Sequence, residues 1–276
     1  RLYKEIEFVH RLGITGISLI DSHELRQRVN SPLYVGGAWW EPNCGIVNPA
    51  KLAWSWRDAA AEKGVQVFEH TPVQAVEQTG TGFTLSTPRW RVRARKVVFA
   101  TNAWSHLFAQ LKAKQVPVWT YIVMTEPLTD QQKEAIRWQG REGVEDFRDF
   151  VHYYRLTADD RIVWGGRDVI LSLDGTMDHD RDEQVFEALR TDLRLTFPAL
   201  AGIRFTHAWG GPVSAPLDLF PAIGHAGSPD AVFVLGCVGH GVSITHLHGQ
   251  TVRDLILERD TDLTQSFFVD RRTVPV

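Results

Sequence analysis

The chain has 276 residues, of which 43% are hydrophobic and 23% charged, and its formal net charge is −3. This composition is typical of a globular protein with one large domain or two small ones. The low net charge and the scattered basic residues argue against a nucleic-acid partner, and no apolar stretch approaches the roughly 20 residues that a transmembrane segment needs. Because no signal-peptide pattern opens the chain, we expect a cytoplasmic protein.

The cysteine and histidine patterns predict no metal centre. Cys44 and Cys237 are too few for a disulfide framework or a thiolate cage, so we expect two reduced thiols. His246 and His248 are two residues apart on a predicted helix, and this spacing points their side chains to different faces. We therefore expect no metal ligands in this chain.

The first part of the chain alternates helical and short extended patterns. A helix is predicted from the spacing of apolar residues at 2–12, and a short helix capped by Ser22 ends before Pro32. Residues 36–42 are expected to form a loop or extended chain. A clear helix is predicted at 50–63, with Asn48 as its cap, Pro49 in its first position and Gly64 as a left-handed C-terminal cap. A strand at 65–69 is expected to complete an α/β crossover, and further strands are predicted at 73–77, 83–86, 91–93 and 96–100.

The middle of the chain differs in pattern from its two ends. Strands are predicted at 116–126, 151–156, 161–165 and 203–210, with a hairpin turn at Asp159–Asp160 and an amphipathic helix at 181–197. The apolar run at 96–100 is typical of a strand that is buried on both faces in a parallel sheet, and the run at 231–235 is predicted to be a buried strand. A helix is predicted at 242–258. The fold class is therefore α/β (α+β overall), with an antiparallel middle region.

The strongest local signal is the glycine-rich turn Gly236-x-x-Gly239-x-Gly241 between a predicted strand and a predicted helix. Such a turn allows positive φ and places free N–H groups of a helix N-terminus beside an anion. A tight structural connection explains the pattern equally well, and the spacing is not that of the G-x-G-x-x-G nucleotide fingerprint. His240, inside the turn, either faces a ligand as a donor or hydrogen-bonds to backbone.

Several blocks of the sequence, taken in order, resemble the FAD-dependent oxidoreductases of the D-amino-acid-oxidase superfamily. Each block is weakly specific, but together they span almost the whole chain, and the 153–156 and 209–211 blocks look closest to the γ-glutamylputrescine oxidoreductase branch. The blocks are Gly45–Leu52, Thr71–Val73, Val97–Trp104, Tyr153–Leu156, Ile162–Gly166, Trp209–Gly211, Pro221–Gly224 and Gly236–Gly241.

The resemblance implies a two-domain enzyme with non-covalent FAD. An incomplete Rossmann-like FAD domain would comprise residues 1–112 and 216–276, and an antiparallel substrate domain residues 113–215. The enzyme would oxidise a C–N bond of a small amine, of the γ-glutamylputrescine type, to an imine, with oxygen or another electron acceptor reoxidising the flavin. The implied catalytic residues are Tyr154, Arg155, Trp209 and His240, and the implied cofactor-binding residues are Val73, Ala100, Thr101, Trp104, Gly236, Gly239, His240, Gly241, Val242 and Ser243.

The chain departs from the family pattern at informative positions. The family's first strand, its G-x-G-x-x-G turn and its ribose-binding acid are expected before Arg1. Val213 and Ser243 stand where other branches carry an arginine or a lysine that grips a substrate α-carboxylate, which favours an amine over an α-amino acid, unless Arg155 supplies another anchor. Gly211 stands near the family's covalent-flavin cysteine. Two alternatives stay open: a D-amino-acid or N-methyl amino-acid oxidase or dehydrogenase, and a truncated remnant that cannot hold FAD.

Overall fold

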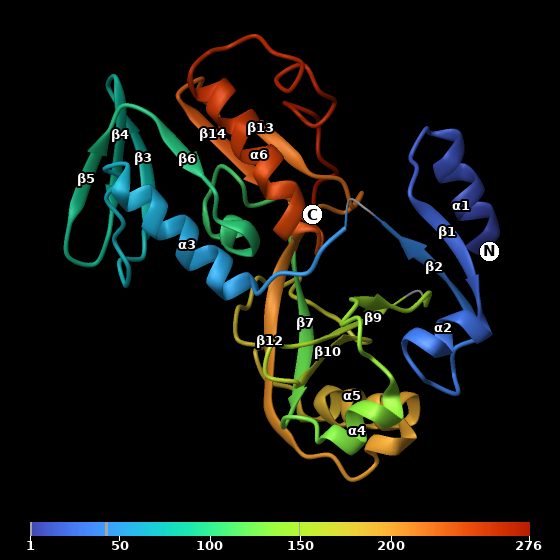
Figure 1. Ribbon diagram of the computed structural model, residues 1–276. Coiled ribbons are helices and arrows are strands. Elements are labelled where there is room, and N and C mark those ends of the chain that lie inside the picture. The colour runs from blue at the N-terminus through green and yellow to red at the C-terminus, as the bar shows by residue number, and fades with distance from the viewer. Residues whose placement is uncertain (1, 42–43, 149) are drawn as a thin grey trace. The chain divides into compact units, whose positions relative to one another are not determined.

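In the computed structural model, which describes residues 2–41, 44–148 and 150–276, the chain divides into two compact units. Each unit collects segments that lie far apart in the sequence (Figure 1). No helix in these described ranges is both long enough and apolar enough to cross a membrane. Unit 1 comprises Arg1–Asn48, Thr120–Val169 and Asp180–Gly210, and unit 2 comprises Pro49–Trp119, Ile170–His179 and Gly211–Val276.

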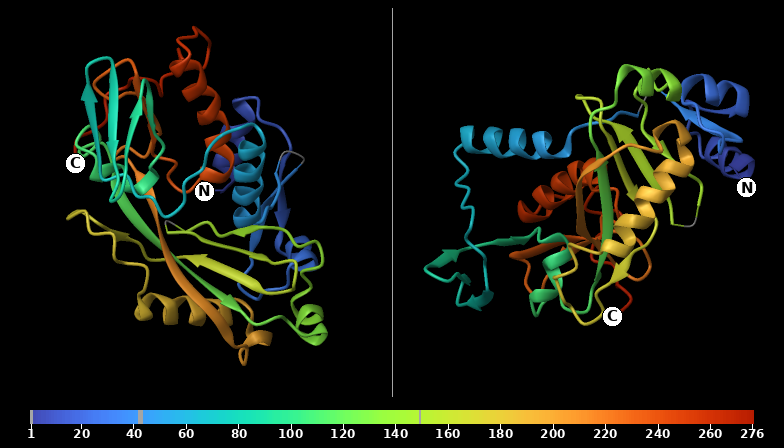
Figure 2. Two further views of the ribbon diagram at one scale, coloured as in Figure 1. Left: turned by 90° about the vertical axis from the view of Figure 1, so that its left-hand side faces the viewer. Right: turned by 90° about the horizontal axis from the view of Figure 1, so that it is seen from below.

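The main feature of unit 1 is an antiparallel sheet that carries α5 across one face (Figures 1 and 2). β12 and β10 both pair with β7, and β9 and then β8 continue the sheet beyond β10. The predicted amphipathic helix and middle strands are thus confirmed, with β12 extending further than expected. The elements are β7 (Val116–Thr125), α4 (Asp130–Ile136), β8 (Val144–Glu145), β9 (His152–Leu156), β10 (Ile162–Gly166), α5 (Glu183–Thr196), η2 (Pro198–Leu200) and β12 (Phe205–Ala215), of which β7 begins and β12 ends in residues that belong to unit 2.

The N-terminal part of unit 1 is a two-stranded antiparallel sheet with two helices. The predicted first helix is present, and the expected extended segment forms one of the strands; its last residue, Pro42, lies outside the described residues. The cap of the second helix is one residue earlier than predicted, because the Asp21 carboxylate, and not Ser22, accepts the Glu24 N–H at 2.8 Å. The elements are α1 (Leu2–Arg11), β1 (Ile17–Asp21), α2 (Ser22–Arg28) and β2 (Gly36–Trp40).

Unit 2 contains a three-stranded mixed sheet against which α6 packs (Figure 1). β14 runs parallel to β6 and antiparallel to β13, so both apolar runs form strands and the run at 96–100 has the parallel partner expected of it. Buried Phe99, Phe108, Phe233 and Leu235 belong to the core beside this sheet. The elements are α3 (Pro49–Glu62), β3 (Ala75–Thr79), β4 (Gly82–Ser86), β5 (Arg91–Ala94), β6 (Val97–Phe99), η1 (Asn102–Leu107), β11 (Ile170–Leu171), β13 (Ala222–His225), β14 (Ala231–Leu235) and α6 (Gly241–Ile256).

Two strand predictions in unit 2 need correction. The helix α3 begins at Pro49 and is followed by Gly64 with φ +86°, as expected, but residues 65–69 form no strand and therefore no crossover. Their apolar side chains are largely exposed and no strand of the described chain pairs with them. β6 is not buried on both faces, because Val98 is 41% exposed while its neighbours Val97 and Phe99, which face the other way, are buried.

The packing of α5 gives a test of the sheet's stability. Leu189 is fully buried on the helix, and Leu195, on the same helix, is 59% exposed. Leu189→Ala is expected to lower the free energy of unfolding by about 2–5 kcal/mol, because it removes apolar contacts and leaves a cavity. Leu195→Ala is expected to change it by about 0.5 kcal/mol or less. Urea denaturation followed by circular dichroism measures both, and equal losses would show that α5 does not pack as described.

Candidate functional site

The glycine-rich turn between β14 and α6 contains three residues with positive φ. Gly236, Val238 and Gly239 have φ angles of +80°, +46° and +86°. A Cβ on Gly236 would lie 2.7 Å from the Pro216 ring, whereas a Cβ on Gly239 would meet no described atom within 4 Å. Close packing therefore requires a glycine at 236, and the surface at Gly239 is accessible to a ligand.

Ser214, which is fully buried near the end of β12, holds this turn in place. Its hydroxyl oxygen accepts the Gly236 N–H at 2.9 Å, and its carbonyl oxygen accepts the Val238 N–H at 3.2 Å. The Ser214 N–H in turn donates to Asn102 Oδ1 at 3.2 Å, and Cys237 Sγ is 3.7 Å from the same oxygen. The turn, the end of β12 and the start of η1 are therefore joined by hydrogen bonds within unit 2.

The N-terminus of α6 presents polar groups that suit an anion. His240 is exposed at the N-cap position, and its Nδ1 lies 3.0 Å from the Val238 carbonyl oxygen, which is the backbone-bonded arrangement considered above. The Ser243 hydroxyl donates to the His240 carbonyl oxygen at 3.2 Å. The N–H groups of Gly241 and Val242 have no acceptor within the helix, and the helix dipole adds partial positive charge there. This end of α6 can stabilise negative charge on a bound group.

The other predicted cofactor residues of unit 2 occupy two segments. One segment follows β6 and contains Ala100, Thr101 and Trp104 on either side of Asn102. Because Asn102 accepts the Ser214 N–H and Ser214 also bonds to the glycine-rich turn, this segment lies beside the turn. Trp104 is 45% exposed and could cover one side of a flat ring. Val73 belongs to a different segment, which precedes β3.

The face of the unit 1 sheet opposite α5 carries Tyr153 and Arg155, both half-buried. Tyr153 pairs across the ladder with Gly165, where a Cβ would lie only 2.6 Å from the tyrosine ring. The glycine thus lets the ring lie flat over β10, and its hydroxyl hydrogen-bonds to the Thr120 side chain. Burial raises the pKa of Tyr153, so its hydroxyl stays protonated.

Tyr154 lies on the α5 face and is 4% exposed. Its ring stacks on Trp164 with centroids 4.0 Å apart, and its hydroxyl is 2.6 Å from the Tyr34 hydroxyl. Burial raises the pKa of Tyr154 to about 12. The structure therefore brings Tyr154 together with Tyr34 and Trp164 and points it away from Arg155; its catalytic role stays a prediction.

Trp209 lies on the same face as Tyr153 and Arg155. A Cβ on the next residue, Gly210, would contact the Tyr121 ring, which itself contacts Phe186 of α5. Gly210 therefore faces α5, and Trp209 faces the other way because successive strand residues alternate. Trp209 is 39% exposed.

Two residues on this face were not among the predicted site residues. Tyr153 is two positions from Arg155, so the alternation of a strand was the signal that would have selected it over Tyr154. Glu145, an exposed carboxylate on β8, is the ladder partner of Tyr153. No local motif marks Glu145, because only the pairing of β8 with β9 places it there.

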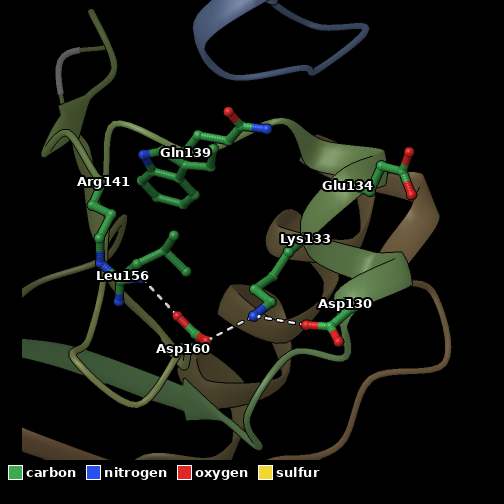
Figure 3. A pocket seen from close by; sticks show the side chains of 8 residues that line it. Asp130, Lys133, Glu134, Gln139, Arg141, Leu156 and Asp160 are labelled. Atoms are coloured by element: carbon green, nitrogen blue, oxygen red, sulfur yellow. Dashed lines mark hydrogen bonds and ion pairs between the residues drawn. The ribbon is translucent and has the colours of Figure 1, made fainter.

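Two surface hollows lie outside these residues. One, of about 420 Å³, is in unit 1, where Lys133 and Arg141 both pair with Asp160 (Figure 3). The other, of about 120 Å³, is in unit 2 and includes Gln115 and Ser172 in its lining. Neither lining contains a predicted site residue. Within the described ranges, no three His, Cys, Asp or Glu residues are grouped to hold a metal ion.

The two strained glycines of the turn give a matched test of its packing. Gly236→Ala and Gly239→Ala both force a left-handed alanine, which costs about 1–2 kcal/mol. Only Gly236→Ala also drives a methyl group into Pro216, so it is expected to destabilise the protein by about 1–3 kcal/mol more. Thermal unfolding of the two variants measures the difference, and equal losses would contradict the close contact at Gly236.

Comparison with known sequences identifies relatives of this chain. The chain is 30% identical over 257 residues to γ-glutamylputrescine oxidoreductase of Escherichia coli strain K12, covering 92% of this chain and 58% of that protein. It is 29% identical over 265 residues to a probable oxidoreductase, OrdL, of Haemophilus influenzae, covering 94% and 58%. The chain thus spans somewhat more than half the length of these curated relatives.

Comparison with solved structures shows the fold. Glycine oxidase from Geobacillus kaustophilus superposes with a TM-score of 0.84 at 21% identity, covering 99% of this chain and 71% of that one. L-Proline dehydrogenase from P. horikoshii superposes with a TM-score of 0.79 at 24% identity, covering 97% and 71%. The sequence profile of the FAD dependent oxidoreductases called DAO matches residues 1–255, and the chain belongs to this family.

Proposed function

We propose that the protein containing this chain oxidises a C–N bond of an amine of the γ-glutamylputrescine type to an imine. The hydride would pass to a non-covalent FAD, and water would hydrolyse the imine. Family membership and the 30% identity to γ-glutamylputrescine oxidoreductase support the reaction class. The whole reaction belongs to the full-length protein, because this chain spans 58% of that relative.

The observation that carries the proposal is the turn at the start of α6. Its accessible glycine, Gly239, and the first-turn N–H groups of Gly241 and Val242 fit a flat, electron-accepting ring that gains negative charge on reduction. Exposed Trp104 and Val242 offer apolar surface to the same ring. Gly211, near the expected place of a cysteine, fits non-covalent binding. Bound FAD would supply the hydride acceptor, and the chain would position it.

The substrate side of the proposal rests on which residues carry charge. Val213 and Ser243 cannot grip an α-carboxylate next to the reacting carbon. Arg155, on the sheet face opposite α5, can bind a carboxylate that is remote from the reacting C–N bond. Glu145 and the Tyr153 ring lie on the same face and suit an ammonium group. An amine with a distant amino-acid end matches this set of groups.

A substrate panel tests the proposed function in the full-length protein. Purified protein is expected to contain FAD, and under anaerobic conditions γ-glutamylputrescine should bleach the flavin faster than D-alanine or sarcosine. Faster reduction by D-alanine or sarcosine would establish the amino-acid alternative instead. Protein that takes up no FAD, even when FAD is added, would contradict the proposal and support the remnant.

Replacement of Arg155 tests the substrate anchor. Arg155→Met is expected to raise KM for γ-glutamylputrescine about 10- to 100-fold, because a hydrogen bond to a charged group contributes about 1.5–3 kcal/mol. Arg204→Met is the matched control, since Arg204 is an exposed arginine of the same unit that pairs with Glu126. Steady-state kinetics measure both, and an unchanged KM in Arg155→Met would remove Arg155 from the site.

Paired tyrosine variants decide which tyrosine serves the reaction. Tyr153→Phe removes a hydroxyl on the face opposite α5, and Tyr154→Phe removes one that bonds to Tyr34. We expect each variant to lower stability by about 1 kcal/mol, because each loses one hydroxyl hydrogen bond. Only Tyr153→Phe is expected to lower kcat/KM, by about tenfold, because only its hydroxyl lies on the face that carries Arg155 and Glu145. The reverse pattern would assign the catalytic role to Tyr154.

A further inference from the structure

The segment that contains β5 concentrates positive charge that the proposed reaction does not use. Of the eight residues that begin at Arg89, five are basic, although the whole chain has a net charge of −3. Arg89, Arg91, Arg93 and Arg95 are all exposed, and none of them forms an ion pair with a described residue. Lys96, by contrast, is paired with two carboxylates. The four arginines are therefore available to a partner that carries negative charge.

β5 is an edge strand of the sheet β3-β4-β5, and in the described chain it pairs only with β4 (Figure 1). Where this ladder begins, the Thr87 N–H donates to the Trp90 carbonyl oxygen at 2.9 Å. Hydrogen-bonded and non-hydrogen-bonded pairs alternate along an antiparallel ladder. The backbone groups of Val92 therefore face β4, whereas those of Arg91 and Arg93 face the free edge. This edge can accept a further strand.

The two faces of β5 differ in their chemistry. Val92 lies opposite Leu85 on the face that packs on the core, yet it is 50% exposed, and Trp90, which continues the same alternation, is 69% exposed. Arg91 and Arg93 lie on the other face, because successive side chains of a strand alternate. A strand added to this edge would place every second side chain beside an arginine and the others beside Trp90 and Val92.

The charge on the edge selects among possible strands. Charged edge residues prevent the pairing of identical chains, and pairing of two copies of β5 would place arginine beside arginine. Protection of the edge does not account for the exposed Trp90, which adds apolar surface there. An acidic strand removes the repulsion and covers the apolar surface, so charge complementarity favours such a strand over a second copy of β5.

We propose that the edge of β5 binds an extended segment of a partner protein in which acidic residues alternate with apolar ones. The segment adds as a fourth strand and hydrogen-bonds to the backbone of Arg91 and Arg93. Its acidic side chains pair with these two arginines and with the flanking arginines of the row, and its apolar side chains cover Trp90 and Val92. None of these residues is proposed to bind the flavin or the amine.

Fluorescence polarisation of a labelled peptide that alternates glutamate with valine tests this surface on the full-length protein. We expect saturable binding at low ionic strength. The double variant Arg91→Gln, Arg93→Gln should weaken binding about tenfold, because it removes two exposed ion pairs. Arg272→Gln is the control, since Arg272 is an exposed arginine of the same unit outside β5, and it should bind the peptide as the wild type does.

A second pair of variants tests the addition of a strand. Arg93→Pro removes the outward-facing N–H as well as the charge, and proline is tolerated on an edge strand where the N–H faces solvent. It should bind the peptide about fivefold more weakly than Arg93→Gln, which removes the charge alone. Hydrogen–deuterium exchange of the wild-type protein needs no variant, and the peptide should slow exchange at the amides of Arg91 and Arg93.

Other anions separate a strand from a simple polyanion. A peptide of the same composition with its glutamates in one block should bind about tenfold more weakly than the alternating peptide. Equal binding of the block peptide, or tighter binding of single-stranded RNA or of phosphatidylserine vesicles, would overturn the proposal and show a general polyanion surface. Absence of binding, or binding that leaves exchange at Arg91 and Arg93 unchanged, would also overturn it.

Discussion

Two hydrogen bonds accepted by buried Ser214 hold the glycine-rich turn in a backbone conformation that ordinary residues avoid. Val238 has φ +46°, and a left-handed residue of this kind costs about 1–2 kcal/mol. Each of the two bonds contributes about 1 kcal/mol, and a lost partner would leave a buried polar group at a further cost. The same serine binds Asn102, so the segment that carries Trp104 and the N-terminus of α6 are fixed together. Of the proposed cofactor contacts in unit 2, those of the segment after β6 and of the turn before α6 depend on this junction, whereas Val73 lies in another segment.

The unit 1 sheet depends in the same way on its register. A shift of one residue in β9 would exchange Tyr153 with Tyr154 and carry Arg155 to the α5 face. The register is held by the contact of Tyr153 with Gly165 and by buried His152, whose ring nitrogens lie 2.8 Å from Asp146 and 3.0 Å from Asp192 of α5. The charged and aromatic side chains proposed to bind an amine are thus positioned by Gly165 on the neighbouring strand and by His152 on the other face of β9.

The sequence was sufficient to predict those elements whose limits are set by the residues at their own ends. Pro49 and Gly64 mark the limits of α3 because proline fits the first turn of a helix and glycine accepts positive φ. The apolar runs predicted the two strands β6 and β14, and the structure shows that they pair in parallel. The same reasoning failed at residues 65–69, where an apolar pattern has no neighbouring strand to pair with. It also failed at Val98, because the packing over each face of a strand is not written in the strand itself.

The candidate site was predictable only in part, because some of its contacts join segments that are distant in the sequence. The glycine-rich turn, Arg155 and Trp209 could be selected from the sequence and its family resemblance. Ser214 and Asn102 could not, because they act through hydrogen bonds between segments more than a hundred residues apart. Glu145 was missed because its place beside Tyr153 follows from the pairing of β8 with β9.

Hydrogen–deuterium exchange of the full-length protein, with and without FAD, tests most directly whether the turn at α6 contacts the cofactor. We expect FAD to slow exchange at the amides of Gly239, Gly241 and Val242, while amides of α5 exchange as before. FAD binding that leaves exchange at the turn unchanged would contradict the assignment of the turn as the flavin contact.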